Sequence, residues 1–267
     1  MRSNMIKVLL IGSNSYIAKS FEDYCKDNRN DLEICKVSAS NSEWVKKSFN
    51  GYDVVVMLAA IVHCKEKKYM ENLYTEVNCE LPIAVAEKAK KSGVKQFLFF
   101  STAAVYGSAV TRITKNTKPL PESLYGRSKY EAELQLKLLD DEEFYVAIVR
   151  PPKVYGAGCK GNFVHLNYIA NHMMLFPKIR NKQSWIQIDR LCEDMIGIIE
   201  SRKKGVFLPQ DETYFYISEY VVQLRAQLGK RTILVPGFNW IIRSLMKRIS
   251  TLKKIFGDFY YDDTCGD

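Results

Sequence analysis

The segment LLIGSNSYIAKSF, residues 9–21, joins an apolar run to a helical pattern through one glycine. The apolar run predicts a buried parallel strand, and the pattern from Ser15 onwards predicts a helix. In a dinucleotide-binding turn, the first glycine makes the bend, the second admits the pyrophosphate, and the third lets the helix pack on the strand. Here these positions hold Gly12, Ser15 and Ala18. Because Ser and Ala are the next-smallest side chains, the segment is compatible with a cofactor turn and equally with an ordinary strand-to-helix bend.

Outward from this segment, strand-like and helix-like patterns alternate along the chain. Apolar runs at residues 32–38, 53–60, 94–102 and 144–156 alternate with helical patterns at residues 42–52, 73–93 and 125–141. Such alternation predicts an α/β fold, a doubly wound parallel sheet (Rossmann) with a smaller C-terminal substrate lobe. The alternation weakens after Pro151. We therefore predict a dinucleotide-binding domain in residues 1–150 and a substrate lobe mainly in residues 151–267, from which strands or helices can return to the first domain.

Composition narrows the class of protein. The chain has 267 residues, 47% of them hydrophobic, and a net charge of +9. No apolar run reaches the roughly 20 residues of a membrane span, and no signal-peptide cleavage pattern follows the N-terminus, so we expect a cytoplasmic protein. The seven cysteines are an odd number without a CxxC pair. This argues against a disulfide framework or a zinc site, and we expect no metal.

The second strand-like run bears on the choice of cofactor. An acidic residue at its end would accept the adenine ribose hydroxyls and repel a 2′-phosphate. This run ends with Lys36, Ser38 and Ser40 and has no Asp or Glu there. The pattern favours NADP over NAD, unless the ribose contact comes from elsewhere in the chain.

The segment YGRSK, residues 125–129, holds a candidate acid–base pair. Tyr125 and Lys129 are four apart at the start of a helical pattern, so both side chains lie on one face. An ammonium beside a phenol favours the phenolate, which would make Tyr125 a usable general base or acid. Upstream, a strand ends in Ser101 and Thr102. At that end of a parallel strand, the Thr102 hydroxyl can reach the oxygen with which Tyr125 exchanges a proton.

At this point the chain resembles a known family, the extended short-chain dehydrogenase/reductases of the NAD-dependent epimerase/dehydratase type. The similar segments occur in family order and cover most of residues 6–195: GSNSYIA (12–18), DVVVMLAA (53–60), VNCELPIAVAEKAKKSGVKQFLFFSTAAVYG (77–107), YGRSKYEAE (125–133), VAIVRPPKVYGAGCKGNF (146–163) and IQIDRL (186–191). The resemblance implies that the sheet binds NAD or NADP, that the lobe binds a nucleoside-diphosphate sugar, and that the protein is a homodimer.

The resemblance also implies roles for individual residues. Thr102 and Tyr125 would hydrogen-bond the reacting sugar hydroxyl, and Lys129 would hold the nicotinamide ribose. The implied cofactor-binding residues are Gly12, Ser15, Tyr16, Ile17, Ser38, Leu58, Ala59, Ala60, Asn78, Tyr125, Lys129 and Pro151. The implied substrate-binding residues are Thr102, Ala103, Asn162, Lys182 and Gln183. Gln183 stands where the most similar branch often has an arginine for the diphosphate, so Arg180 and Lys182 are candidate substitutes.

Departures from the family pattern limit the reaction. Sugar 4,6-dehydratases carry an Asp–Glu pair directly after the catalytic threonine, where this chain has Ala103 and Ala104. Dehydration is therefore disfavoured, and oxidation or reduction at a sugar carbon remains. We favour an NAD(P)H-dependent 4-keto sugar reductase of surface polysaccharide synthesis over an NAD-dependent UDP-sugar 4-epimerase. The acidic ribose partner is missing, and the segments YGRSKYEAE, KGNF and IRNKQSWIQIDRL most resemble a branch of UDP-glucose 4-epimerases and UDP-4-keto-6-deoxy-N-acetylhexosamine reductases. A catalytically silent dinucleotide-binding sensor is the remaining alternative.

Basic charge gathers near the C-terminus. Residues 220–257 contain no Asp or Glu, and the apolar residues of 238–256 fall on one helical face. One interpretation is a lobe helix that packs its apolar face and exposes a basic face. The other is an interfacial helix in peripheral contact with anionic lipid. Nucleic-acid binding is not expected, since no binding motif accompanies the basic residues.

Overall fold

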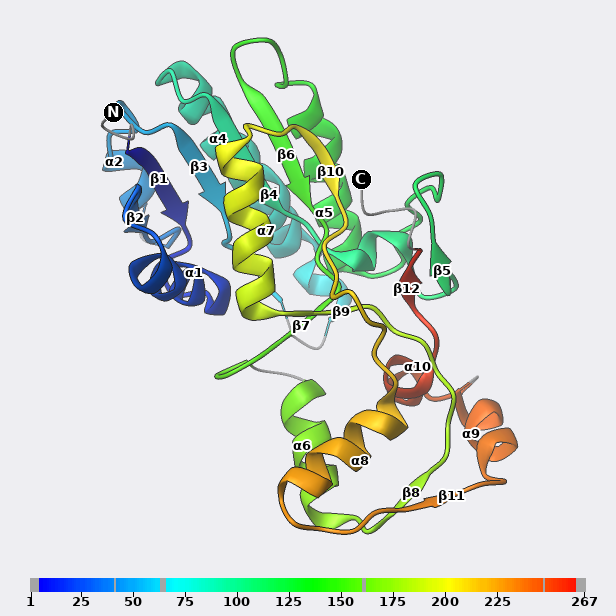
Figure 1. Ribbon diagram of the computed structural model, residues 1–267. Coiled ribbons are helices and arrows are strands. Elements are labelled where there is room, and N and C mark those ends of the chain that lie inside the picture. The colour runs from blue at the N-terminus through cyan, green and yellow to red at the C-terminus, as the bar shows by residue number, and fades with distance from the viewer. Residues whose placement is uncertain (1–4, 41, 63–65, 160–161, 247, 263–267) are drawn as a thin grey trace. The chain divides into compact units, whose positions relative to one another are not determined.

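The computed structural model describes residues 5–40, 42–62, 66–159, 162–246 and 248–262 (Figure 1). The chain divides into two compact units. Unit 1 consists of Met1–Ser108, Lys118–Pro152 and Ile186–Pro209, and unit 2 consists of Ala109–Thr117, Lys153–Trp185 and Gln210–Asp267. Each unit therefore combines segments that are far apart in the sequence.

Unit 1 is built on a six-stranded parallel sheet, which confirms the predicted α/β class (Figure 1). Its strands are β1 (Ile6–Ile11), β2 (Leu32–Val37), β3 (Val54–Met57), β4 (Gln96–Phe100), β6 (Tyr145–Val149) and β10 (Gly205–Phe207), in the order β10-β6-β4-β3-β1-β2. Its helices are α1 (Tyr16–Asn28), α2 (Glu43–Lys46), α3 (Glu71–Thr75), α4 (Leu81–Lys91), α5 (Leu124–Lys137) and α7 (Ile188–Glu200). Strand β1 lies between β2 on one side and β3 on the other, so the order of the strands changes direction at β1. Ligands of such sheets bind at the carboxyl ends of the strands at this point.

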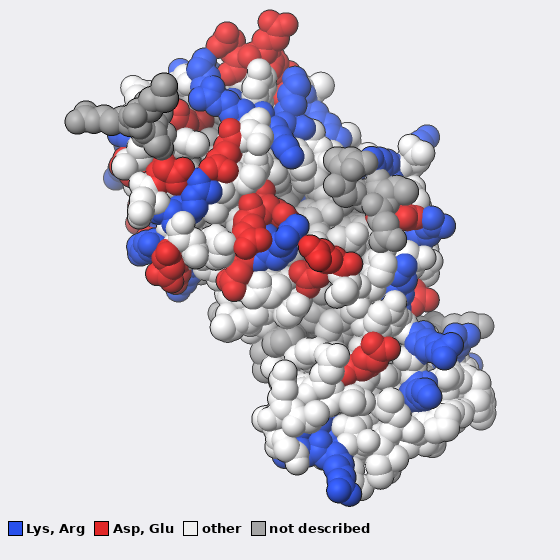
Figure 2. Space-filling model, in the orientation of Figure 1, with Lys and Arg blue, Asp and Glu red and all other residues white. Residues whose placement is uncertain are grey.

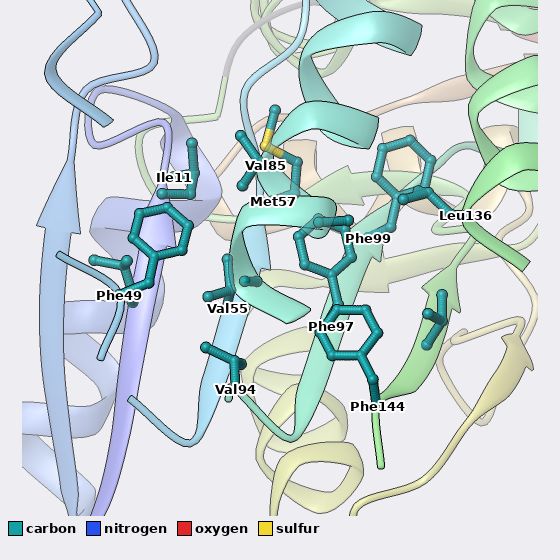
Figure 3. Close-up of a cluster of buried hydrophobic side chains, with 14 of the residues drawn as sticks. Ile11, Phe49, Val55, Met57, Val85, Val94, Phe97, Phe99, Leu136 and Phe144 are labelled. Atoms are coloured by element: carbon teal, nitrogen blue, oxygen red, sulfur yellow. The ribbon is translucent and has the colours of Figure 1, made fainter. Parts of the chain in front are cut away.

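Helices cover both faces of this sheet: α1 packs beside α7 on one, and α4 beside α5 on the other (Figure 1). The outside of unit 1 carries acidic and basic side chains together (Figure 2). Inside, alternate strand residues point toward α4 and α5, among them Ile11, Val55 and Phe97 (Figure 3). Because successive strand residues face opposite sides, this alternation buries one apolar set under each pair of helices. Truncating a buried Phe such as Phe97 to Ala would cost about 3–5 kcal/mol.

Three irregular helical turns accompany these elements. They are the 3₁₀ turns η1 (Lys68–Met70) and η3 (Ala103–Tyr106) and the π-helical turn η2 (Glu76–Glu80). The π-helical turn lies between α3 and α4, and such turns are rare and occur frequently at functional sites.

Unit 2 contains short elements around a small core. They are β5 (Arg112–Ile113), β7 (Lys153–Tyr155), α6 (Asn162–His172), β8 (Leu175–Pro177), α8 (Ile217–Gln227), β11 (Ile233–Val235), α9 (Asn239–Met246), α10 (Ser250–Phe256) and β12 (Tyr260–Tyr261). Strand β9 (Trp185–Gln187) begins in this unit and leads into α7. Parallel pairs join β5 to β12 and β8 to β11. The core includes Phe176, Ile217 and Trp185, whose ring stacks on Phe215 with centroids 3.9 Å apart.

The single helical face expected over residues 238–256 is wrong in one respect. The segment forms two helices, α9 and α10, and Ile249 before α10 is extended with φ −117° and ψ 101°. Residue spacing does not reveal such a break, because apolar residues at helical spacing occur on both sides of it. Lys247 lies outside the described residues.

Candidate active site

The predicted cofactor turn adopts the geometry that its small residues allow. Gly12 has φ +108°, and a Cβ there would lie 2.7 Å from the Ala59 backbone nitrogen, so only glycine fits. Ser15 is the N-cap of α1, and its Oγ accepts a hydrogen bond of 3.1 Å from the Ala18 amide. Ala18 is fully buried. Ser15 and Ala18 thus take the second and third small positions while α1 still begins at the turn, where the positive end of a helix favours an anion.

A cavity of about 690 Å³ lies at the carboxyl ends of β1, β2 and β3. It is lined by Gly12, Ser13, Asn14, Ser15, Ser38, Ala39, Ser40, Ser42, Trp44, Leu58, Ala59, Ala60, Glu76, Val77 and Leu81. Six of the expected cofactor residues are in this set, whereas Tyr16 and Ile17, the first residues of α1, are not. The sequence prediction missed Trp44 and Glu76. Trp44 follows β2 and Glu76 follows β3, and no sequence motif fixes the number of residues between strand and side chain. Glu76 is nevertheless only two residues before the expected Asn78.

The side of this cavity that lies after β2 carries hydroxyls. The Oγ atoms of Ser38 and Ser40 are 2.7 Å apart. Lys36 is instead paired with Glu22, whose pKa this ammonium lowers. Among the described residues that line the cavity there is no Lys or Arg, and Glu76 adds a carboxylate. The basic residue on which the expected preference for NADP rested is therefore engaged outside the cavity.

Tyr125 lies in the first turn of α5, where two side chains accept three hydrogen bonds from the backbone. Ser123 is the N-cap, and its Oγ accepts from the Gly126 amide at 3.0 Å. The Glu66 carboxylate accepts from the amides of Leu124 at 2.9 Å and of Tyr125 at 3.2 Å. Sequence reasoning missed Glu66, because no spacing rule relates it to α5. The carboxylate fixes the turn that carries the phenol.

Thr102 and Tyr125 are brought together, as the sequence predicts for a shared proton-transfer site. Burial raises the pKa of Tyr125 to about 12, and a hydrogen bond with the Thr102 side chain opposes this rise. Thr102 is itself fixed, since its Oγ1 caps η3 by accepting from the Ala104 amide at 3.1 Å. The lowering of the Tyr125 pKa that was expected from Lys129 is not found, because burial dominates and the opposing contribution comes from Thr102. Tyr125 therefore carries its proton at neutral pH.

Lys129 lies one turn further along α5 and is 1% exposed. Its Nζ donates to the Phe100 carbonyl at 2.8 Å and lies 4.5 Å from the centroid of the Phe99 ring. Burial lowers the pKa of Lys129 to about 7, and the neighbouring Glu133 carboxylate opposes this. The side chain is thus held against the end of β4 in a state that exchanges its proton near neutral pH.

Asn78 braces the site from behind. It is fully buried in η2, its Oδ1 accepts from the Ile61 amide at 2.8 Å, and its Nδ2 donates to the Ile61 carbonyl at 3.2 Å. The same Nδ2 lies 3.3 Å from Ser128 Oγ, which donates to the Tyr125 carbonyl at 3.1 Å. Asn78 therefore links the loop after β3 to the catalytic turn of α5 rather than lining the cofactor cavity.

A buried ionic network that the sequence did not reveal supports the same region. Arg150 donates through Nε to Glu133 at 2.9 Å and through Nη1 to the Tyr106 hydroxyl at 2.7 Å, and its Nη2 also pairs with Glu133. Ser101 donates to Glu133 as well. Next to Arg150, the buried Pro151 accepts at its carbonyl from the Ala103 amide at 3.1 Å. These contacts fix the ends of β4 and β6 around Thr102.

Unit 2 has a cavity of its own, of about 700 Å³. Four exposed cations line it, Lys178, Arg180, Arg243 and Lys253, together with Thr111, Ile179, Pro236, Asn239, Ile242, Met246, Phe256, Gly257 and Asp258. The excess of positive charge suits an anionic ligand. From this set, the sequence predicted Arg180 as a diphosphate contact, whereas Arg243 and Lys253 belong to the basic C-terminal segment.

The other expected substrate residues do not line this cavity. Gln183 is buried, and its amide donates to the carbonyls of Ile255 at 3.1 Å and Gly257 at 2.7 Å while it accepts from Lys153 Nζ at 2.7 Å. The ammonium of Lys182 lies 3.6 Å and 4.2 Å from the ring centroids of Tyr214 and Tyr260. Arg180 is the expected substitute that reaches the cavity. Asn162 begins α6, and its side chain lies outside the described residues.

The described residues contain no group of three or more His, Cys, Asp or Glu side chains that could hold a metal ion. No helix in this part of the chain is both long and apolar enough to cross a bilayer.

Comparison with known proteins adds sequence relatives. The model of the NAD dependent epimerase/dehydratase family matches residues 6–182. The UDP-glucose 4-epimerase of Vibrio cholerae is 33% identical over 251 residues, which cover 89% of this chain and 76% of that protein. The N-acetyl-alpha-D-glucosaminyl-diphospho-ditrans,octacis-undecaprenol 4-epimerase of Escherichia coli is 33% identical over 188 residues, 68% of this chain and 56% of that protein.

Solved structures share the fold. The UDP-glucuronic acid 4-epimerase of Bacillus cereus, in complex with NAD, matches with a TM-score of 0.72 and 17% identity over 96% of this chain and 90% of that chain. A dTDP-4-dehydrorhamnose reductase of Clostridium acetobutylicum matches with a TM-score of 0.71 and 17% identity over 87% of this chain and 84% of that chain. At these identities the likeness concerns the fold.

Proposed function

Because the chain belongs to the NAD-dependent epimerase/dehydratase family, we propose that it is an NAD-dependent 4-epimerase of a nucleoside-diphosphate hexose. The observation that carries this choice is the lining of the cavity in unit 1, where hydroxyls and the Glu76 carboxylate stand without a described Lys or Arg. A ribose with free hydroxyls suits such a lining, whereas a 2′-phosphate would lack a cation. An epimerase needs retained NAD, since it oxidises the sugar and reduces it again with the same cofactor.

The residues of unit 1 fit a dinucleotide. The cavity volume lies within the roughly 300–1,000 Å³ of ligand sites. The close approach of Gly12 to Ala59 and the N-terminal end of α1 would form a cradle for a pyrophosphate. Bound NAD would supply the hydride acceptor and a positive charge at the nicotinamide ring.

The chain's own residues handle the proton. Tyr125 exchanges a proton with the hydroxyl on carbon 4 of the sugar, and Thr102 hydrogen-bonds the same oxygen. Lys129 places a titrating ammonium one turn away. Burial alone keeps the Tyr125 phenol protonated. In this proposal, the positive charges of Lys129 and of the bound nicotinamide lower the pKa of Tyr125, so that the phenol can give up and take back its proton.

We propose the cavity of unit 2 as the site for the substrate's diphosphate. Arg180 and Arg243 can each donate two parallel hydrogen bonds to phosphate oxygens. Lys178 and Lys253 add positive charge to the same lining. This assignment replaces the expected Gln183 contact, because the Gln183 amide is committed to backbone carbonyls.

The second candidate is a 4-keto sugar reductase, the reaction favoured by the sequence alone. The observation in its favour is the protonated state of Tyr125, which suits donation of a proton to a carbonyl oxygen that receives a hydride. The two candidates differ in whether the cofactor is retained or consumed.

The test begins with the nucleotide that the purified protein carries. We expect release of NAD or NADH on denaturation, identified by mass spectrometry, and interconversion of UDP-glucose and UDP-galactose without added cofactor. Consumption of NADPH in proportion to a UDP-4-ketohexose, with no epimerisation, would support the reductase instead. Failure to bind NAD, NADH, NADP or NADPH would overturn both candidates and leave a protein without dinucleotide chemistry.

A further inference from the structure

Helix α9 presents two faces with different surroundings. Asn239, Ile242, Arg243 and Met246, at spacings of three and four, line the cavity of unit 2. The opposite face, which starts at Trp240 and continues through Ile241 and Leu245, does not line it. Trp240 is 73% exposed, although a soluble helix normally buries an indole of this size. On the face of α9 that turns away from the cavity, Trp240 and Leu245 are therefore exposed, whereas Ile241 is half-buried.

This exposed face continues along an edge of unit 2. In the parallel pair of β8 and β11, Leu175 lies opposite Ile233, and the two are 53% and 50% exposed. Figure 1 shows β8 and β11 running along the lower edge of this unit, with β11 leading toward α9. We call the whole set the apolar rim: Leu175, Ile233, Phe238, Trp240, Leu245 and Ile249, all exposed. Large apolar side chains exposed on neighbouring elements of one small unit indicate an interaction site.

The segment of the chain that carries most of the apolar rim has charges of one sign. No acidic residue occurs between positions 220 and 257, whereas Arg231, Arg248 and Lys254 are exposed. In Figure 2 the lower edge of unit 2 consists of uncharged residues with some Lys and Arg among them. A protein interface is typically depleted of Lys and surrounded by charges of both signs. Indole, leucine and isoleucine beside cations without carboxylates are the composition of a helix that lies on anionic lipid.

We propose that the apolar rim docks unit 2 on an anionic lipid bilayer. Helix α9 would lie in the plane of the interface, with Trp240 and Leu245 at the boundary between headgroups and acyl chains. Arg248 and Lys254 would face the lipid phosphates. The charge complementarity selects this occupant over a neutral surface. This docking is independent of the reaction at the active site, so either function proposed above is compatible with it.

Tryptophan fluorescence gives a direct test. The chain has three tryptophans, and Trp240 is the exposed one, since Trp185 is buried and Trp44 is partly buried. We expect the full-length protein to co-sediment with vesicles of phosphatidylcholine and phosphatidylglycerol, and its emission to shift to shorter wavelength. Vesicles of phosphatidylcholine alone should bind much less, and added salt should weaken the binding to anionic vesicles.

Two variants test the assignment to the apolar rim. Trp240→Ser should weaken partitioning to anionic vesicles roughly tenfold, because an indole no longer leaves water, and Arg248→Glu should also weaken it. The matched control is Leu138→Ser, which removes an apolar side chain that is 77% exposed at the C-cap of α5 in unit 1. Its partitioning should equal that of the wild type. Thermal unfolding of all three variants checks that each is folded.

Other outcomes would overturn the proposal. Absence of binding to anionic vesicles at low salt would do so, as would equal loss of binding in Trp240→Ser and Leu138→Ser. Light scattering provides the remaining arm. If the wild type is a dimer in solution and Trp240→Ser is a monomer, the apolar rim is an interface between copies of this chain instead of a lipid-binding surface.

Discussion

The two cavities have nearly the same volume, about 690 Å³ in unit 1 and about 700 Å³ in unit 2, yet opposite chemistry. The cavity of unit 1 is lined by hydroxyls, small apolar residues and one carboxylate, and its anion-binding groups are backbone amides at the start of α1. The cavity of unit 2 is lined by four exposed cations. Under the proposed function, the dinucleotide would be selected by close approach of the backbone, and the sugar nucleotide by side-chain charge.

This contrast extends to the charges that each unit buries. In unit 1 the ammonium of Lys129 is almost completely removed from water, and its pKa falls to about 7. In unit 2 the cations that line the cavity stay exposed and cost little to keep charged. Substitutions in unit 1 should therefore change the chemical step or its pH dependence. Substitutions in the unit 2 cavity should change affinity and its dependence on salt.

The largest expected effect concerns Tyr125. Tyr125→Phe removes the hydroxyl that exchanges the sugar proton and should lower kcat roughly 10²–10⁴-fold. Binding of NAD should remain, because Tyr125 is not among the residues that line the unit 1 cavity. The measurement combines steady-state kinetics with titration of NAD against the protein.

Tyr130→Phe is the matched control, since Tyr130 lies on the same helix α5 one turn later and is also partly buried. It should leave kcat near the wild-type value. Full turnover by Tyr125→Phe would remove Tyr125 from the reaction and with it the proposed chemistry of unit 1.

The next effect concerns the charges of unit 2. Arg180→Gln and Arg243→Gln should each raise KM for a nucleoside-diphosphate sugar roughly tenfold, the loss expected for a charge-assisted hydrogen bond. Because each variant removes one cation from the cavity, the dependence of KM on salt should become shallower. The kcat and the affinity for NAD should change little. Steady-state kinetics at several salt concentrations check all three quantities.

Arg248→Gln serves as control, since Arg248 is exposed in the same segment of the chain but does not line the cavity. If all three variants raised KM equally, the effect would come from net charge rather than from this cavity. If Arg180→Gln and Arg243→Gln left KM unchanged, the cations of the unit 2 cavity would not bind the substrate, and the proposed diphosphate site would be wrong.

The sequence predicted the parts of unit 1 that depend on contiguous segments. The runs that became β1, β3 and β4 are apolar and end in glycine, alanine or hydroxyl residues, so their carboxyl ends could be assigned to a ligand site before the structure was known. Asn78 and Pro151 were also named, through family resemblance. The structure gives them bracing contacts with Ser128 and Ala103.

The cavity of unit 2 could not be predicted in the same way, because it assembles from separate segments around Thr111, Arg180, Arg243 and Lys253. Residues 109–117 join unit 2 through the pairing of β5 with β12, and no local pattern indicates that pairing. The predicted substrate contact of Gln183 is wrong for a related reason. Family position suggested a phosphate contact, whereas the side chain is buried among backbone carbonyls that only the fold brings together.

The pKa values of the candidate pair Tyr125 and Lys129 also could not be predicted from the sequence. The spacing of Tyr125 and Lys129 predicted one helical face, and on that basis a lowered phenol pKa. Burial reverses the expectation, since it raises the pKa of Tyr125 to about 12 and lowers that of Lys129 to about 7. Residue spacing predicts which face of a helix a side chain lies on. It does not predict how deeply that face is buried, and burial determines these pKa shifts.

The smallest expected effect tests this buried charge through stability. In the unfolded chain Lys129 titrates near 10.4, and in the folded protein its pKa falls to about 7. The folded state therefore binds fewer protons than the unfolded state between these values, so the free energy of unfolding falls as pH decreases from about 10 to about 7 and then levels. Lys129→Met removes this cost, although it also removes the hydrogen bond to Phe100.

Relative to the wild type, Lys129→Met should thus gain at least about 1 kcal/mol in the free energy of unfolding between pH 9.5 and pH 6.5. Urea denaturation at the two pH values measures this difference. Lys137→Met, which removes an exposed lysine from the same helix, should show no such change because its ammonium is hydrated in both states. A pH-independent difference for Lys129→Met would mean that the ammonium keeps its proton throughout, and that unit 1 holds its cation as readily as unit 2 does.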